Sequence, residues 1–286
     1  MKTTLSILIL GFLLLSITFN SCRKKDPAID LTTNSTQDNT VAENLFEDII
    51  KVVVEVIDDE GASMRVKSGF SFGNCATVNI NPSWVDTIWP KVITIDFGST
   101  NCIGTDGIKR RGKIIVTFND LYKNPGSVLN VQLQNYYVNE HLIEGTKTIT
   151  NNGRNSSNNL SFTVNVSNGK ITFPNNGGVT TWSSIRTNEW IAGESTNLFT
   201  HGVAGICDDV YLITGNANGI NRLGKSYTMQ ITNPLRKEIC CRWLVSGTIN
   251  ITPSGLPTRI LDFGTGACDN NASLTIGSST FNFMMY

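Results

Sequence analysis

Lys91-Val-Ile-Thr-Ile-Asp-Phe-Gly-Ser-Thr-Asn-Cys102 is the first of two copies of a motif that decides which fold this chain is expected to adopt. The second copy, Pro257-Thr-Arg-Ile-Leu-Asp-Phe-Gly-Thr-Gly-Ala-Cys268, follows 166 positions later. In each copy the Asp-Phe-Gly step lies between two cysteines that are 27 residues apart, Cys75 with Cys102 and Cys241 with Cys268. A constant offset over such a span indicates an internal duplication, and we assign the repeated units to residues 75–118 and 241–284.

Both copies alternate apolar and polar residues, as β-strands do when successive side chains point to opposite faces. Ile93, Ile95 and Phe97 share one face, so Asp96 lies on the other face, next to a glycine. Asp262 has the same position in the second copy. Two roles are open for these aspartates: each accepts backbone N–H groups in the turn that follows, or the pair binds calcium or acts in catalysis. We favour the structural role.

The chain from about residue 66 onward reads as β-strands separated by turns. Strand-like segments rich in β-branched and aromatic residues alternate with Asn-Gly steps, which accept positive φ angles and close tight hairpins. These steps lie at residues 151–153, 167–169, 175–178 and 218–219. The predicted fold is all-β, an antiparallel sandwich or a partly closed barrel, with a single β domain over residues 61–286.

One amphipathic helix is expected before the β domain. Apolar residues recur at three- and four-residue steps from Leu45 to Ile57, and Thr40 with Glu43 matches a capping box. Val52-Val53-Val54 argues for a strand, but the acidic residues fall mostly on the polar face of a helix. We predict a helix over residues 41–60, and a flexible polar tether over residues 22–40.

The first 22 residues have the features of an export signal. Lys2 precedes an apolar run from Leu5 to Phe19, and Ser21-Cys22 follows. Residues 1–21 therefore read as a signal peptide. Cys22 after a small residue resembles the lipobox of bacterial lipoproteins, and the resemblance implies that the Cys22 thiol is acylated and anchors the mature chain in a bilayer. A plain secretion signal and a single membrane helix are the alternatives.

Export would place the other six cysteines in an oxidising compartment, where disulfides are expected. Many pairings are open to six cysteines. The repeated 27-residue spacing favours Cys75–Cys102 and Cys241–Cys268, which leaves Cys207–Cys240 as the third pair. The adjacent residues Cys240 and Cys241 then have different partners.

Charge and motifs exclude several functions. Removal of residues 1–21 takes away Lys2 and leaves 22 basic and 23 acidic residues, a balance that does not favour nucleic acid. The chain has no nucleophile elbow, phosphate-binding loop, zinc-protease helix or Cys-x-x-Cys pair. The sequence therefore assigns no catalytic residue, no metal ligand and no cofactor.

Two groups of residues are candidates for surface roles. Trp84 and Trp89 lie in an insertion between prolines and are the first candidates for binding through exposed aromatic rings. Lys109, Arg110, Arg111 and Lys113 form the only basic cluster in the predicted β domain, and we expect it on a solvated hairpin.

Taken together, several motifs resemble a family of lipoproteins from Bacteroidota-type bacteria, over nearly the whole mature chain. The motifs are Ser21-Cys22-Arg-Lys-Lys-Asp, Ile-Asp-Phe-Gly-x-x-x-Cys with Gly104-x-Asp106-Gly107, Arg111-Gly112-Lys113, Asn135-Tyr136-Tyr137 and Glu144-Gly145-Thr146. The resemblance implies an outer-membrane lipid anchor, with the body facing the periplasm or the cell surface, and it implies no activity.

Two functions remain open on the sequence alone. One is a non-catalytic envelope protein that binds a glycan, a lipid or another envelope protein. The other is a polysaccharide hydrolase with Asp96 and Asp262 as its paired carboxylates. We favour the first, because duplicated carboxylates have equivalent surroundings, whereas a catalytic acid and base need different ones.

Overall fold

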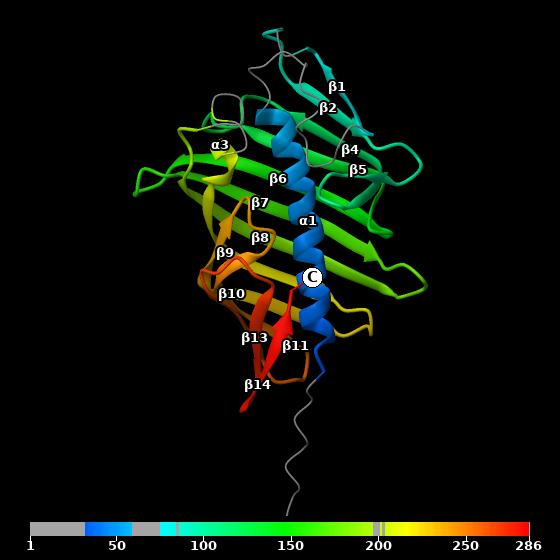
Figure 1. The fold of residues 1–286 in the computed structure, drawn as a ribbon, viewed down its shortest axis with the longest axis vertical. Helices are drawn as coiled ribbons and strands as arrows, with labels where there is room; N and C mark the ends of the chain where they lie inside the picture. The colour runs from blue at the N-terminus through cyan, green and yellow to red at the C-terminus, as the bar shows by residue number, and fades with distance from the viewer. Residues whose placement is uncertain (1–31, 59–74, 84–85, 197–200, 202–203, 286) are drawn as a thin grey trace, which may run out of the picture.

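The computed structural model describes residues 32–58, 75–83, 86–196, 201 and 204–285. One N-terminal helix precedes a 14-stranded antiparallel sheet that is not closed (Figure 1). The helices and strands are α1 (Asn34–Asp58), β1 (Thr77–Asn81), β2 (Lys91–Asp96), β3 (Cys102–Ile103), β4 (Lys109–Phe118), β5 (Val128–Val138), β6 (His141–Arg154), β7 (Leu160–Thr172), β8 (Val179–Ala192), α3 (Ala204–Cys207), β9 (Val210–Ile220), β10 (Ser226–Glu238), β11 (Leu244–Pro253), β12 (Arg259–Thr265), β13 (Asn271–Ile276) and β14 (Ser279–Met284).

The strands follow one another across the sheet in chain order, and only β3 lies off this path, paired with β4. The mostly β composition and the preceding helix agree with the sequence prediction. Of the two predicted arrangements, the two-sheet sandwich is wrong, because all strands of the described chain belong to one sheet. That sheet is not closed into a barrel, because β1 does not pair with β14. The helix α1 covers the inner face instead of a second sheet (Figure 1).

The core lies between α1 and the inner face of the sheet. Ala42, Phe46, Ile49 and Val53 of α1 are buried, and the inner side chains of the strands are buried opposite them. With 25 residues, α1 is about 37 Å long, so it crosses many strands. Its side-chain contacts run from Arg110 on β4 to Arg222, just after β9, and Arg259 on β12 binds the carbonyl of Thr32 just before the helix. The helix therefore organises most of the sheet around itself.

A line of β-bulges bends the long strands. Gly112, Gly145, Gly215 and Gly247 all have positive φ, on β4, β6, β9 and β11 respectively. A Cβ at Gly112 would lie 1.9 Å from the carbonyl oxygen of Asn135, and one at Gly247 would lie 2.5 Å from that of Pro234. The strand register shifts beside these glycines. Bulges increase the local bend and twist of a strand. The bulges at these four glycines therefore allow the sheet to curve around α1.

The helix begins at Asn34, seven residues before the predicted start at residue 41. The carbonyl of Thr33 accepts the N–H of Gln37, at 2.9 Å. The Thr40 hydroxyl donates to the carbonyl of Thr36, as in a helix interior, so Thr40 is not the cap. The predicted tether is therefore wrong over residues 34–40, while residues 22–31 and 59–60 lie outside the described part.

Tertiary hydrogen bonds explain this early start. The Asn221 amide donates to Ser35 Oγ at 2.9 Å, the backbone N–H of Arg222 donates to Asp38, and Trp182 Nε1 donates to Asn39 Oδ1 at 3.1 Å. Ser, Asp and Asn have low helix propensity in isolation. Here their hydrogen bonds to residues of the sheet and of one turn stabilise the helical conformation.

Three of the four predicted Asn-Gly turns lie inside strands. Only residues 175–178 connect two strands, β7 and β8. Residues 151–153, 167–169 and 218–219 belong to β6, β7 and β9. Asn168 has a φ of 54°, and the register of β7 against β8 shifts beside it. The strands are longer than predicted because bulges take up the positive-φ residues.

The duplicated motif is preserved in β2 and β12 but not in the strands beside them. Val78 pairs with Ile95, which lies 17 positions later, whereas Ile249 pairs with Leu261, 12 positions later. On the other side Ile95 pairs with Ile114, and Leu261 pairs with Leu274. The counterpart of β4 is therefore β13. Residues 280–284, which lie 166 positions after residues 114–118 and would be their counterpart by sequence offset, belong to the extra strand β14. Connection lengths changed between the copies although the cysteine spacing did not.

Candidate binding groove

A groove crosses the outer face of the sheet, the face opposite α1, over β7, β8, β9, β10 and β11. Its volume is about 670 Å³, and it adjoins a smaller hollow of about 250 Å³ that shares Asn168, Ser183 and Asn218 with it. Strand alternation explains the lining. Trp182 and Tyr227 point inward and are buried, whereas their neighbours Thr181 and Thr228 point outward.

The strand register arranges the polar side chains in rows across the groove. Ser183 on β8 lies opposite Asn218 on β9, which lies opposite Thr228 on β10, and Thr228 lies opposite Thr252 on β11. A neighbouring row runs through Ile185, Asn216, Gln230 and Asn250. Strands are about 4.8 Å apart, so hydroxyl and amide groups recur along the groove at that interval.

The groove is almost free of charge. Among the described residues that line it, Lys170 is the one with a charge, and its ammonium pairs with Glu144 at 2.7 Å. Within the described chain, the side chains of Ser183, Asn216 and Asn218 form no hydrogen bond with protein atoms. Their donors and acceptors therefore face solvent, available to a neutral ligand that carries many hydroxyl groups.

The floor of the groove is attached to α1 from the inner side. The Trp182 indole donates to Asn39 Oδ1 at 3.1 Å and stacks on Phe46 with a centroid separation of 5.4 Å. Arg186 also lies on the inner face of β8, two positions after Ser184. It pairs with Glu43 of α1 at 2.7 Å. These buried contacts hold β8 in place, so we expect the groove to be rigid before a ligand arrives.

Acidic residues of α1 pair with cations on the inner face at four places along the helix. The pairs are Asp38–Arg222 at 2.7 Å, Glu43–Arg186 at 2.7 Å, Glu47–Lys147 at 3.3 Å and Asp48–Arg110. Burial raises the pKa of Asp38, even though Arg222 acts in the opposite direction. Burial alone would lower the pKa of Arg110, but its hydrogen bonds to Asp48 and Asp106 outweigh burial and raise that pKa. The polar face of α1 is therefore an internal docking surface.

Asp96 holds the turn that follows β2, and Asp262 holds a bulge inside β12. The N–H of Gly98 donates to Asp96 at 2.9 Å, and that of Gly264 donates to Asp262 at 2.8 Å. Asp96 also pairs with Lys113 at 2.8 Å, and this contact together with the Gly98 N–H lowers the pKa of Asp96. Eight strands separate β2 from β12 in the sheet, and β2 and the C-terminal strands lie at opposite ends of the molecule (Figure 1). The structure does not bring the two carboxylates together.

The aromatic and basic candidates have other surroundings than predicted. Trp89 is half-buried and packs edge-on against Phe118 at 5.6 Å, with the Lys91 ammonium 5.0 Å from its ring, while Trp84 lies outside the described residues. Arg110 is fully buried rather than solvated, because alternation along β4 turns it toward Asp48 on α1. Its neighbour Arg111 faces outward and pairs with Glu140.

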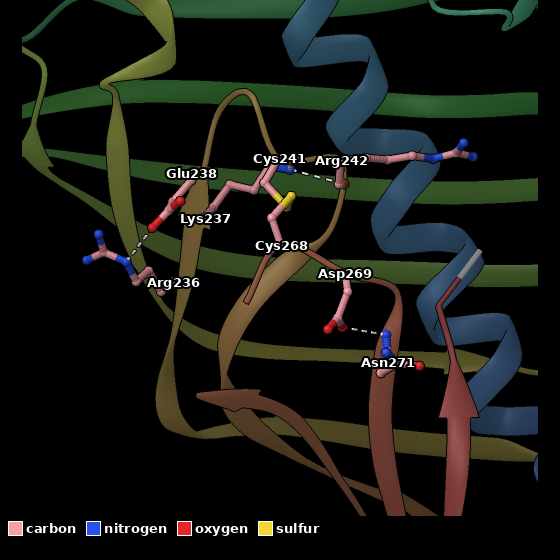
Figure 2. Close-up of a disulfide and its surroundings, with 8 residues drawn as sticks. All are labelled: Arg236, Lys237, Glu238, Cys241, Arg242, Cys268, Asp269 and Asn271. Atoms are coloured by element: carbon pink, nitrogen blue, oxygen red, sulfur yellow. Dashed lines mark hydrogen bonds and ion pairs between the residues drawn. A yellow bond between two sulfur atoms is a disulfide. The ribbon is translucent and has the colours of Figure 1, made fainter. Parts of the chain in front are cut away.

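Three disulfides join Cys75 to Cys102, Cys207 to Cys240 and Cys241 to Cys268, the pairs that the repeat predicts. Figure 2 shows the third disulfide beside Lys237, whose ammonium donates to the carbonyl oxygens of Cys241 and Arg242. Burial lowers the pKa of Lys237 to about 8. Lys237 thus links the end of β10 to the turn that carries this disulfide.

Two further kinds of site are absent from the described residues. No three His, Cys, Asp or Glu side chains among them converge as metal ligands. No helix in that part of the chain is long and apolar enough to cross a membrane. Cys22 lies outside the described residues, so its chemistry is not seen.

Comparison with protein-family models, curated proteins and solved structures found no match for this chain.

The groove was not anticipated from the sequence, although a signal for it exists. Hydroxyl and amide residues occupy alternate positions at 181 and 183, 216 and 218, and 226 and 228. Which strands lie side by side, and hence that these positions form rows, depends on the tertiary structure.

Proposed function

We propose that this chain is a lipid-anchored, non-catalytic protein of the bacterial cell envelope that binds a neutral oligosaccharide through the groove on its outer face. The observation that supports it best is the run of uncharged hydroxyl and amide side chains aligned across β8 to β11. Sugars present many hydroxyl groups and no charge, so they match these donors and acceptors. A charged ligand would meet no free opposite charge along the lining.

The anchoring part of the proposal rests on the N-terminal sequence. Cys22 follows a signal-like segment and stands where a lipobox cysteine would be acylated. The three disulfides are consistent with a location outside the cytoplasm. We place the protein at the outer membrane, and protease treatment of intact and permeabilised cells would distinguish a periplasmic body from a surface-exposed one.

Glycan binding can be tested with a groove variant and a matched control. Purified protein is screened against neutral oligosaccharides, and the best ligand is titrated by calorimetry. Asn218→Leu removes two donors and an acceptor from the central row and should weaken binding about tenfold, or about 1.4 kcal/mol. Thr228→Val should weaken it less, and Thr214→Val, which lies on β9 outside the groove, should leave affinity unchanged.

Two results would reject glycan binding. One is the absence of measurable affinity for any neutral glycan in the wild type. The other is an unchanged affinity in Asn218→Leu with its melting temperature preserved. The alternative, a hydrolase with Asp96 and Asp262 as paired carboxylates, is not favoured, because Asp96 holds a turn, Asp262 holds a bulge inside β12, and eight strands separate β2 from β12.

A further inference from the structure

The end of the molecule at which α1 begins carries a cluster of exposed aliphatic side chains. Leu223, in the turn between β9 and β10, is 72% exposed, and Val179, Ile220 and Ile260 are also exposed. We call these four residues the anchor rim. We infer that the anchor rim lies against the lipid bilayer, an inference that rests on the proposed acylation of Cys22.

Contacts with the first turns of α1 place the anchor rim around the start of the helix. The Arg222 backbone N–H and side chain both bind Asp38, so the turn that bears Leu223 lies on the first turns of the helix. A Cβ at Gly178, next to Val179, would lie 3.3 Å from the Arg222 side chain. Figure 1 shows the turn between β9 and β10 beside the lower end of α1, where the helix begins.

The length of the preceding chain limits the distance to the membrane. Arg259 on β12 donates to the carbonyl of Thr32 at 3.2 Å, which attaches the chain to the sheet just before α1. Cys22 precedes Thr32 by ten residues. Even fully extended, ten residues span at most about 35 Å. An acyl group on Cys22 therefore keeps this end of the body within about 35 Å of the bilayer.

The charges at the anchor rim also suit a membrane surface. The turns between β7 and β8, β9 and β10, and β11 and β12 contain no acidic residue, and Lys225 lies in the middle one. Arg222 lies in the same turn, but its charge is paired with Asp38 of α1. Arg23, Lys24 and Lys25 follow Cys22 in the sequence. Basic side chains are attracted to anionic headgroups, and exposed aliphatic groups gain free energy by leaving water. Exposed aliphatic residues elsewhere, such as Ile88 and Leu121, lack this connection to the anchor.

Photo-crosslinking from the bilayer would test the orientation. The full-length protein is purified from membranes in detergent and reconstituted into vesicles of phosphatidylethanolamine and phosphatidylglycerol. The vesicles also contain a lipid with a diazirine near its headgroup. After irradiation and digestion, adducts are mapped by mass spectrometry. We expect several-fold more adducts on peptides containing Val179, Ile220, Leu223 and Ile260 than on the turn that contains Leu121.

The same digest separates the two ideas under test. Acylated Cys22 with adducts on the anchor rim supports the inference. Acylated Cys22 with adducts near Ile88 and Leu121, or spread evenly over the surface, overturns the inference and leaves the anchor in place. An N-terminal peptide without acyl groups overturns the proposed anchor, and the orientation fails with it.

Discussion

Arg110 and Arg111 are neighbours on β4, yet the sheet sends them to opposite faces. Arg110 is fully buried and pairs with both Asp48 and Asp106, whereas Arg111 is partly exposed and pairs with Glu140. We expect Arg110→Leu to lower the free energy of unfolding by about 3–5 kcal/mol, because it leaves two largely buried carboxylates without their cation.

The adjacent arginine is the matched control for this experiment. Arg111→Leu removes an exposed ion pair and should cost less than about 1 kcal/mol. Urea unfolding of both variants measures the difference. Equal losses would contradict the central role that we give to the contact between β4 and α1.

Lys237 should make stability depend on pH. Burial lowers its pKa to about 8 in the folded protein, from 10.5 for the free side chain, so between these pH values the unfolded chain binds more protons than the folded one. The free energy of unfolding should therefore rise with pH across this window, with no contribution from Lys237 to the slope below it. Urea unfolding at several pH values would show this rise in the wild type and a smaller rise in Lys237→Met. Parallel curves would exclude Lys237 as its source.

At the scale of an element, the bulge at Gly112 sets the bend of β4 against β5. Gly112→Ala should be strongly destabilising, because its Cβ would overlap the Asn135 carbonyl and its φ is +87°. Gly107 has a φ of +75° with open space around it, so Gly107→Ala should cost only about 1–2 kcal/mol of backbone strain. The difference in urea midpoint between the two variants reports the cost of the clash between the added Cβ and the Asn135 carbonyl, because both variants carry the positive-φ strain. Similar midpoints would mean that the strand adapts without the bulge.

The start of α1 shows how an element can depend on contacts beyond its own sequence. Apolar periodicity located the body of the helix, because Phe46, Ile49 and Val53 face the sheet. Periodicity could not locate its first two turns, where Ser35, Asp38 and Asn39 bind Asn221, Arg222 and Trp182. Those partners are more than 140 positions away in the sequence. A cap-like pattern at Thr40 was misleading because its hydroxyl donates within the helix.

For the whole molecule, the two 27-residue disulfide loops make a comparison within one chain. Cys75–Cys102 and Cys241–Cys268 close loops of equal length. In one variant both cysteines of the first loop are replaced by alanine, and in the other both cysteines of the second loop. The loop-closure entropy of the unfolded chain predicts that each variant loses about 3.5 kcal/mol of unfolding free energy. Thermal and urea unfolding of the two variants would measure these losses. If the two variants lose very different amounts of unfolding free energy, loop-closure entropy is not the main term. Contacts in the folded protein near one disulfide, such as those of Lys237, would then account for the difference.

The proposed groove and the anchor rim share Ile220, so the two surfaces meet at one end of the molecule. Under both proposals, a ligand in the groove would lie near the bilayer on which the body rests. The open sheet then presents its outer face to the surroundings, while α1 occupies its inner face.

The sequence by itself determined the strand content, the duplicated Asp-Phe-Gly step and the disulfide pairs, because these follow from period-two alternation and from the spacing of residues along the chain. The tertiary structure decided that one sheet curves around α1, that Arg110 points inward and that Asn218 aligns with Ser183 and Thr228. These features depend on strand register and on contacts between residues far apart in sequence. A one-residue change in register moves a side chain to the other face, and no local pattern specifies that register across fourteen strands.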